Sequence, residues 1–147
     1  MALTMWSMAQ PVSARTRARA RKPISYTFYT AQSDSVAFQL QLAEAAMLID
    51  TAHLHAYRAA AAGVYPDFLA RARVRADTGW AIDHIVKAID ILLSAHGAGS
   101  FADANPLQRI WRDSSVAARH AVVLPVIGYE IYGKALLGRD DHITPLV

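Results

Sequence analysis

The feature that most constrains the fold is a long helical pattern between Pro66 and His96. Pro66 and Asp67 suit the first turn of a helix, and Gly97 suits the residue after its end. Six aliphatic residues within it recur at helical spacing and form one apolar stripe: Ile82, Ile85, Val86, Ile89, Leu92 and Leu93. A helix of about 30 residues is about 45 Å long, so it needs a long partner along that stripe.

A second helical pattern of similar length supplies the partner. Ser33 or Ser35 can cap it, and it runs to about Ala62, just before Gly63. Its apolar residues lie on more than one face: Leu40, Ala43, Met47, Ile49, Leu54 and Tyr57. Hydrophobic residues make up 54% of the chain, and many are alanine, which favours closely packed helices. We therefore expect the surplus apolar surface to be buried in a homo-oligomer, either a dimer or a tetramer.

The stretch from Asn105 to Gly138 predicts two shorter helices that meet at Leu124 and Pro125. Asn105 can cap the first helix, Pro106 suits its first position, and Gly138 can close the second helix in a left-handed turn.

Two spacings within this stretch carry further expectations. Arg109, Asp113, Val116 and His120 are separated by steps of four, three and four, so a helix would place them on one face. Gly128 and Gly133 interrupt the last helix, where each costs up to about 1 kcal/mol, and close helix–helix contact is the expected reason for both.

Together these patterns predict an all-α fold, a four-helix up-down bundle over residues 33–147 with two long and two shorter helices. Residues 1–32 are expected to form a basic leader and a disordered or extended linker. Arg71, Arg73 and Arg75 crowd the first half of the second long helix. A solvated face is the expected reason, with salt bridges across a subunit interface or contact with a neighbour's phosphate as alternatives.

The net charge of +3 belongs to the leader. Residues 1–33 hold five basic side chains, Arg15, Arg17, Arg19, Arg21 and Lys22, and no acidic one. The leader is expected to be disordered or the remnant of an upstream domain. A nucleic-acid arm is the weaker reading, because no aromatic residues alternate with the arginines. An acid-free leader that contains Arg and Ser also resembles a transit peptide, which stays a second alternative although the leader has no convincing amphipathic face.

The segment RIWRDSSVAARH, followed by a proline and by GYEIYGKALLG, carries a family resemblance. It resembles the C-terminal helical domain of the acyl-CoA dehydrogenase superfamily, and more narrowly the group D flavin-dependent monooxygenases. These are the oxygenase halves of two-component aromatic hydroxylases. In them a W-R-D segment is followed, seven residues after the Asp, by a histidine that faces flavin and substrate. The resemblance starts near Tyr26 and covers the last third of a family member.

The resemblance implies a catalytic role for His120 and cofactor contacts for Arg112 and Asp113. Ser100, in the small-residue loop GAGS, is implied as a contact to the flavin phosphate. FMN or FAD would be the cofactor, supplied in reduced form by a flavin reductase. A neutral imidazole at His120 could accept the proton of a phenol, whereas an imidazolium could stabilise negative charge on activated oxygen. Both roles stay open. The stretch Ile24–Thr30 would be an extended linker that leads into the helical domain.

Other classes of site fit the sequence less well. No cysteine is present, which excludes disulfides and thiolate metal sites. His53 and His55 lie two residues apart and would point in different directions on a helix, so we expect no metal pair. No uncharged apolar run reaches the roughly 20 residues of a membrane span, and a cytoplasmic protein is expected.

Two functions remain. The first is the C-terminal domain of a flavin-dependent monooxygenase or acyl-CoA dehydrogenase-like oxidoreductase. In that case the chain is expected to be a fragment or remnant without the flavin-holding β-domain, and to bind flavin weakly by itself. The second is a helical oligomerisation module without catalysis of its own.

Overall fold

The computed structural model describes residues 20–61 and 67–147, and within them all regular structure is helical. The helices are α2 (Val36–Ala61), α3 (Phe68–His96), α4 (Pro106–Ala117) and α5 (Pro125–Leu136), with short 3-10 helices η1 (Gln32–Asp34) and η2 (Ala98–Phe101). The predicted all-α class, with two long and two shorter helices, is confirmed. Most of the basic leader lies outside the described residues.

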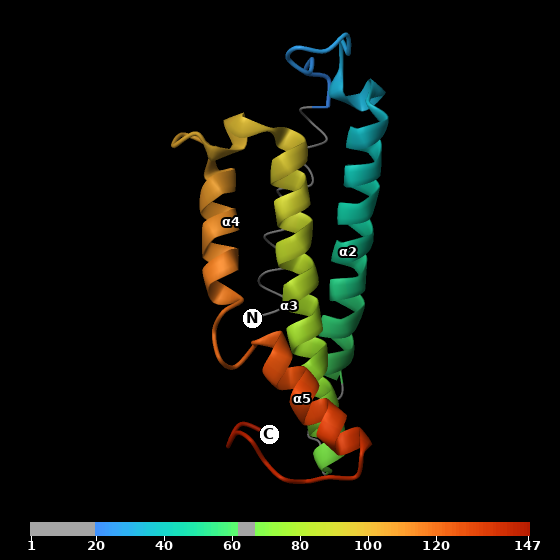
Figure 1. Cartoon of the computed structure of the whole chain (residues 1–147), viewed down its shortest axis with the longest axis vertical. Coiled ribbons are helices and arrows are strands. Elements are labelled where there is room, and N and C mark those ends of the chain that lie inside the picture. Colours follow the sequence, from blue (N-terminus) through green and yellow to red (C-terminus); the bar gives the residue numbers. More distant parts are fainter. Residues whose placement is uncertain (1–19, 62–66) are drawn as a thin grey trace.

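Helix α3 is the centre of the molecule (Figure 1). Helix α2 runs antiparallel to it along one side. Helices α4 and α5 follow one another along another side, with α4 beside the later half of α3 and α5 across the earlier half. The directions of α2, α3 and α4 therefore alternate, whereas α5 continues in the direction of α4.

The core lies mainly between α2 and α3. Small residues of α2, among them Ala45, Ala52 and Ala56, face the aliphatic stripe of α3, of which Ile82, Ile85, Ile89, Leu92 and Leu93 are buried. Alanine lets the two backbones approach closely, and each fully buried isoleucine or leucine contributes about 1.5–3 kcal/mol. The predicted stripe on α3 is confirmed. Most of the large apolar residues of α2 instead point outward.

The helix ends follow the local signals. Ser35, Asp67 and Asn105 each accept a hydrogen bond from a backbone N–H in the first turn of the helix that follows. Gly97 and Gly138 take φ angles of 83° and 70°, in the left-handed region that glycine adopts without strain.

The prediction that the third helix continues to Leu124 is wrong. Helix α4 ends at Ala117, and His120 lies in the turns that follow it, so it does not extend the helical face of Asp113 and Val116. One packing requirement and one backbone restriction explain why α4 ends early. Val123 is drawn into the core, where 3% of it is exposed. The residue before Pro125 is also disfavoured in helical conformation.

The glycines of α5 have different roles. A Cβ atom at Gly128 would lie 2.9 Å from the carbonyl oxygen of Arg75, so the predicted close contact is confirmed there. At Gly133 a Cβ atom would meet nothing within 4 Å, so the same prediction is wrong. Gly79 of α3 makes an unpredicted close approach, because its Cβ would lie 2.9 Å from the Cα of Pro125.

The linker Ile24–Thr30 is not a strand. It folds back in turns, with a hydrogen bond from the Thr27 N–H to the Ile24 carbonyl oxygen and a φ of 61° at Tyr26. Among the described residues, no helix is both long and apolar enough to cross a membrane.

Candidate functional site

The seven residues that join α4 to α5, 118–124, carry His120; we call them the connecting loop. The His120 N–H donates to the Ala117 carbonyl oxygen at 3.1 Å, and the His120 carbonyl oxygen accepts from the Val123 N–H at 2.9 Å. Val123 points into the core, whereas His120 is exposed. The loop therefore presents the imidazole on the surface from a backbone bonded on both sides.

The hydrogen bonding of His120 selects one form of its neutral ring. Its Nδ1 accepts a hydrogen bond from the backbone N–H of Val122 at 3.3 Å. An accepting Nδ1 carries a lone pair, so the proton of the neutral imidazole lies on Nε2. The outer edge of the ring is then a hydrogen-bond donor.

Arg112 and Asp113 form an ion pair on the exposed side of α4. The Arg112 Nε and Nη2 atoms donate to the same Asp113 oxygen at 3.1 and 3.0 Å. Both side chains are more than half exposed, and pairs of this kind contribute about 0–1 kcal/mol. The Arg112 guanidinium can therefore exchange Asp113 for a phosphate with little loss of free energy, and until then Asp113 orients the guanidinium.

Ser100 lies far from the connecting loop. It is fully buried in η2, and its hydroxyl donates to the Gly97 carbonyl oxygen at 2.8 Å, where it closes the end of α3. The 12 residues of α4 separate it from the connecting loop, a length of about 18 Å. The phosphate contact of Ser100 stays a prediction, and the burial of its side chain argues against it. A polar hollow of about 410 Å³ lies at the start of α4, after η2, and is lined by residues 103–106, Gln108 and Arg109.

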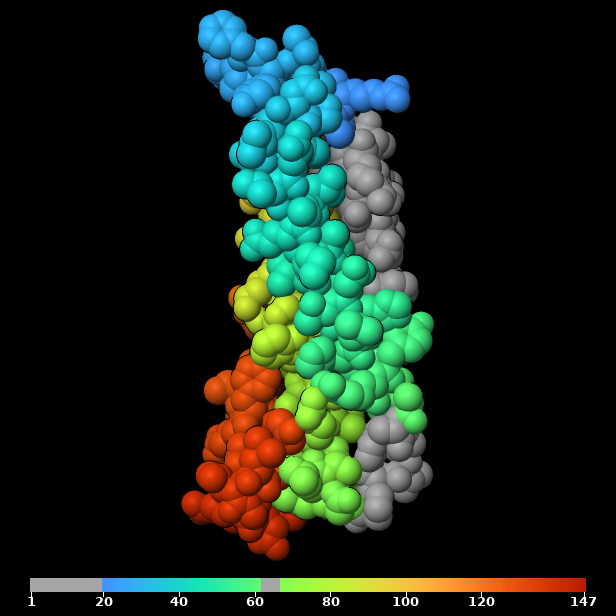
Figure 2. Space-filling model, turned by 90° about the vertical axis from the view of Figure 1, so that its right-hand side faces the viewer, coloured from blue at the N-terminus to red at the C-terminus, as the bar shows by residue number. Residues whose placement is uncertain are grey.

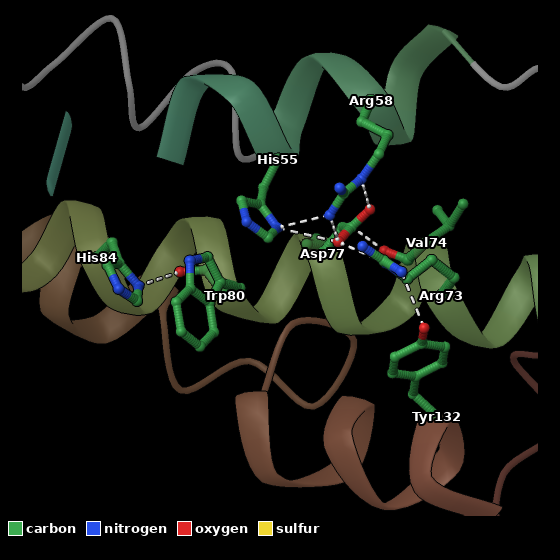
Figure 3. A network of polar contacts seen from close by, with 9 residues as sticks. His55, Arg58, Arg73, Val74, Asp77, Trp80, His84 and Tyr132 are labelled. Carbon is green, nitrogen blue, oxygen red and sulfur yellow. Dashed lines mark hydrogen bonds and ion pairs between the residues drawn. The ribbon is translucent and has the colours of Figure 1, made fainter. Parts of the chain in front are cut away.

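An ionic cluster around a buried carboxylate, not predicted from the sequence, joins α2 and α3 (Figure 3). Its centre is Asp77, of which 2% is exposed. Arg58 Nε donates to Asp77 Oδ2 at 2.8 Å, Arg73 Nε donates to Oδ1 at 3.2 Å, and His55 Nδ1 lies 3.0 Å from Oδ1. The Arg73–Asp77 spacing of four residues was readable in the sequence. The partners on α2 were not.

The cluster keeps Asp77 ionised. Burial alone would raise the pKa of Asp77, but hydrogen bonds from Arg58, His55 and Arg73 outweigh it, so the pKa lies below its usual value. The same hydrogen bond raises the pKa of Arg58. The cluster therefore ties α2 to α3 through fixed charges. Arg73 keeps 42% of its side chain exposed, so it is partly solvated, as expected, and also paired with Asp77.

Aromatic residues extend the cluster toward α5. Trp80 stacks between His55 and His84, with ring centroids 5.5 and 4.2 Å away. Arg73 Nη1 donates to the Tyr132 hydroxyl at 2.8 Å. His55, Trp80, Arg73 and Tyr132 line a mainly apolar groove of about 400 Å³. In the described part of the chain, no group of three or more His, Asp or Glu could hold a metal ion.

Comparison with known proteins gives one family. The model of the acyl-CoA dehydrogenase C-terminal domain matches residues 1–125. The flavin-dependent monooxygenase oxygenase subunit HsaA of Mycobacterium tuberculosis is 35% identical over 107 residues, which are 68% of this chain and 27% of that protein. The oxygenase component of p-hydroxyphenylacetate 3-hydroxylase from Acinetobacter baumannii is 33% identical over 80 residues, 54% of this chain and 19% of that protein.

A solved structure is similar over nearly the whole chain. XiaF from Streptomyces sp., in complex with FADH2 and glycerol, is 38% identical with a TM-score of 0.92, over 99% of this chain and 39% of that chain. The chain thus spans between a fifth and two fifths of the length of these relatives.

Proposed function

The chain belongs to the acyl-CoA dehydrogenase C-terminal domain family, and from this premise we propose that it forms the C-terminal helical part of the oxygenase in a two-component, flavin-dependent aromatic monooxygenase. The observation that carries the proposal is the agreement with the FADH2-bound XiaF structure over 99% of this chain. The remaining two domains of such an oxygenase would hold most of the flavin.

The exposed residues of α4 and the connecting loop fit one wall of a flavin site. Arg112 offers a guanidinium whose bond to Asp113 is easily exchanged for a phosphate. The flavin would be FMN or FAD, and the FADH2 in the similar structure favours FAD. Bound reduced flavin supplies the electrons that activate oxygen, and a flavin reductase would deliver it.

His120 is the proposed catalytic residue. Its Nδ1 is occupied by the Val122 N–H, so the neutral ring offers an Nε2–H toward the site. A donor in this place stabilises negative charge that develops on an oxygen atom of the reactants. The hydrogen bonding thus supports donation by His120 over removal of a phenolic proton, which would need a lone pair on Nε2.

Self-association belongs to the same proposal. Leu40, Met47 and Leu54 are spaced by seven residues on α2, and each is more than three fifths exposed. A stripe of this kind on a helix is covered when a second copy packs against it, in a dimer or a tetramer. This stripe also suits the alternative of a purely structural oligomerisation module, which predicts the same assembly without any role for His120.

A chimera tests the function. This chain would replace the corresponding C-terminal part of the Acinetobacter p-hydroxyphenylacetate 3-hydroxylase component, and reduced flavin would be supplied in excess. We expect the chimera to hydroxylate p-hydroxyphenylacetate, measured by chromatography of the product. A chimera that folds, assembles and binds reduced flavin, yet forms no product, would contradict the proposal.

A further inference from the structure

The connecting loop has a polar support on α3. The Nη2 atom of Arg75 donates to the carbonyl oxygen of Ala121 at 2.8 Å. Ala121 directly follows His120 and precedes Val122, whose N–H bonds the His120 ring. The guanidinium therefore holds the peptide group that joins Ala121 to Val122, and the N–H of that peptide group bonds the His120 ring.

Packing alone does not hold the loop at this point. A hollow of about 440 Å³ lies on the side of Val122, with Arg75, Val74, Thr78 and the C-terminal residues 145–147 among its walls. Close-packed side chains fix a loop because they leave no space for it to move, and this space is partly open. The hydrogen bond from Arg75 is thus a stronger restraint here than apolar contact.

The backbone of α3 at Arg75 is closely packed against the start of α5. A Cβ at Gly128 would lie 2.9 Å from the carbonyl oxygen of Arg75, and one at Gly79, a turn later on α3, would lie 2.9 Å from Pro125. The start of α5 is therefore pressed against the same face of α3 from which Arg75 reaches the loop. A restraint that starts from a rigid helix positions its target more accurately than one that starts from another loop.

Burying the charged Arg75 side chain costs free energy that an apolar side chain would not cost. Burial lowers the pKa of its guanidinium, and in the described structure its buried Nε atom has no hydrogen-bond partner. An apolar side chain of similar length would fill this place without the cost of desolvating a charge. The bond to Ala121 is what the charged group adds.

We infer that Arg75 is a positioning residue for His120, acting through the backbone of the connecting loop. This inference rests on the proposed function for its catalytic meaning, but the restraint itself is a property of this chain. Arg75 orients the loop peptide so that the Val122 N–H meets Nδ1, and the donor at Nε2 then has a fixed direction.

Nuclear magnetic resonance of the full chain tests the restraint. The ¹⁵N spectrum of the His120 ring distinguishes its two neutral forms, and amide exchange follows Val122 and Val123. In Arg75→Met, which keeps the apolar stem, we expect both ring forms to appear and the two amides to exchange about 10–100-fold faster, as for a lost charged hydrogen bond. Arg75→Lys retains a donor and should fall between the parent and Arg75→Met.

Val74→Ala is the matched control, since it alters the same hollow without touching Ala121; its His120 spectrum should equal that of the parent. An unchanged His120 ring and unchanged exchange in Arg75→Met would overturn the inference. If Arg75→Met does not fold, Arg75→Gln, which is shorter and uncharged, takes its place and should show the same loss; an unchanged His120 ring and unchanged exchange in Arg75→Gln would then overturn the inference.

Failure of the proposed function looks different. In the chimera, Arg75→Met should lower kcat about 10-fold while KM for p-hydroxyphenylacetate changes less, and it should add nothing to His120→Ala, because both act through one group. A chimera in which His120→Ala leaves kcat unchanged defeats the catalytic role, even when the spectra of Arg75→Met show that the restraint exists.

Discussion

Among single residues, the chemistry of His120 depends on a hydrogen bond from the backbone N–H two residues later. The sequence left two roles open, acceptor or charged donor. The Val122 N–H on Nδ1 favours a donor at Nε2 that needs no positive charge. The side chain is exposed, so substitutions there should leave the free energy of unfolding within about 0.5 kcal/mol of the parent.

This assignment predicts unequal effects of two substitutions in the chimera. His120→Ala should slow hydroxylation by about 10–10,000-fold, the range for loss of an acid–base group or a charge-stabilising donor. His120→Gln keeps an N–H donor and should recover most of that loss. Product formation under saturating substrate measures both. Equal loss in the two variants would show that His120 acts as a base, and a lower melting temperature with unchanged hydroxylation would reduce it to a structural residue.

Asp77 is the residue on which the α2–α3 contact depends electrostatically. Replacing it with asparagine leaves Arg58 and Arg73 without their shared carboxylate. Both arginines are partly exposed and regain water, so we expect a loss of about 1–3 kcal/mol in the free energy of unfolding at pH 7, at the lower end for a buried pair. Urea denaturation followed by circular dichroism measures it. A loss below about 0.5 kcal/mol would show that the cluster does not stabilise the fold.

The pH dependence of the same cluster follows from the lowered pKa of Asp77. The unfolded carboxyl, with a pKa of about 3.9, takes up a proton before the folded one as the pH falls. Ionised Asp77 therefore stabilises the fold fully above about pH 5, and its contribution is lost progressively as the pH falls below that value. The difference in stability between the parent and Asp77→Asn should shrink between about pH 5 and the folded pKa. The control is Asp141→Asn, an exposed carboxyl whose pKa is lowered to about 2 by Lys134 and Arg139; solvent screening should make its effect smaller.

At the scale of helices, the glycines of α5 allow a matched comparison. Gly128→Ala places a methyl group 2.9 Å from a backbone oxygen of α3, so a helix must shift, at a cost of about 1–3 kcal/mol. Gly133→Ala meets nothing within 4 Å and should gain up to about 1 kcal/mol from helix propensity. Thermal unfolding should thus move in opposite directions. A stabilised Gly128→Ala variant would show that α5 does not pack on α3 as described.

The sequence predicts the structure correctly where the signals are local. The cap at Asn105, the cap at Ser35 (one of the two serines proposed) and the stripe on α3 depend on neighbours within one or two turns, and these predictions are correct. Asp67 was expected within the first turn of α3 and instead caps it. The end of α4 was not, because Val123 is drawn into a core formed by residues of α2 and α3. The Asp77 cluster joins residues 19 and 22 positions apart on two helices, so it depends on the register of α2 against α3. Sequence spacing within one helix does not contain that register.

The whole molecule has an elongated shape in which α2 forms much of one face (Figure 2). The buried side of α2 is largely alanine, whereas its outward side carries the larger apolar groups. A single copy therefore leaves exposed the part of α2 with the most apolar surface. This distribution is expected of a helix at the interface between copies and unfavourable for a monomer in water.

We expect the chain to self-associate through that face. Met47 and Leu54 are 66% and 73% exposed, and two copies that pack along α2 would bury both. The double substitution Met47→Glu, Leu54→Glu would place charges in such an interface, and we expect the assembly to dissociate into folded monomers because buried, unpaired carboxylates are strongly disfavoured. Light scattering after size-exclusion chromatography gives the mass, and circular dichroism checks that the helices remain. Leu137→Glu, at a position 78% exposed just after α5, is the matched control and should leave the mass unchanged. A parent chain that is monomeric at micromolar concentration would contradict the prediction. If the double variant stays assembled, the interface lies on another face of the molecule, because a dimer along this stripe would have to bury opposed pairs of glutamates.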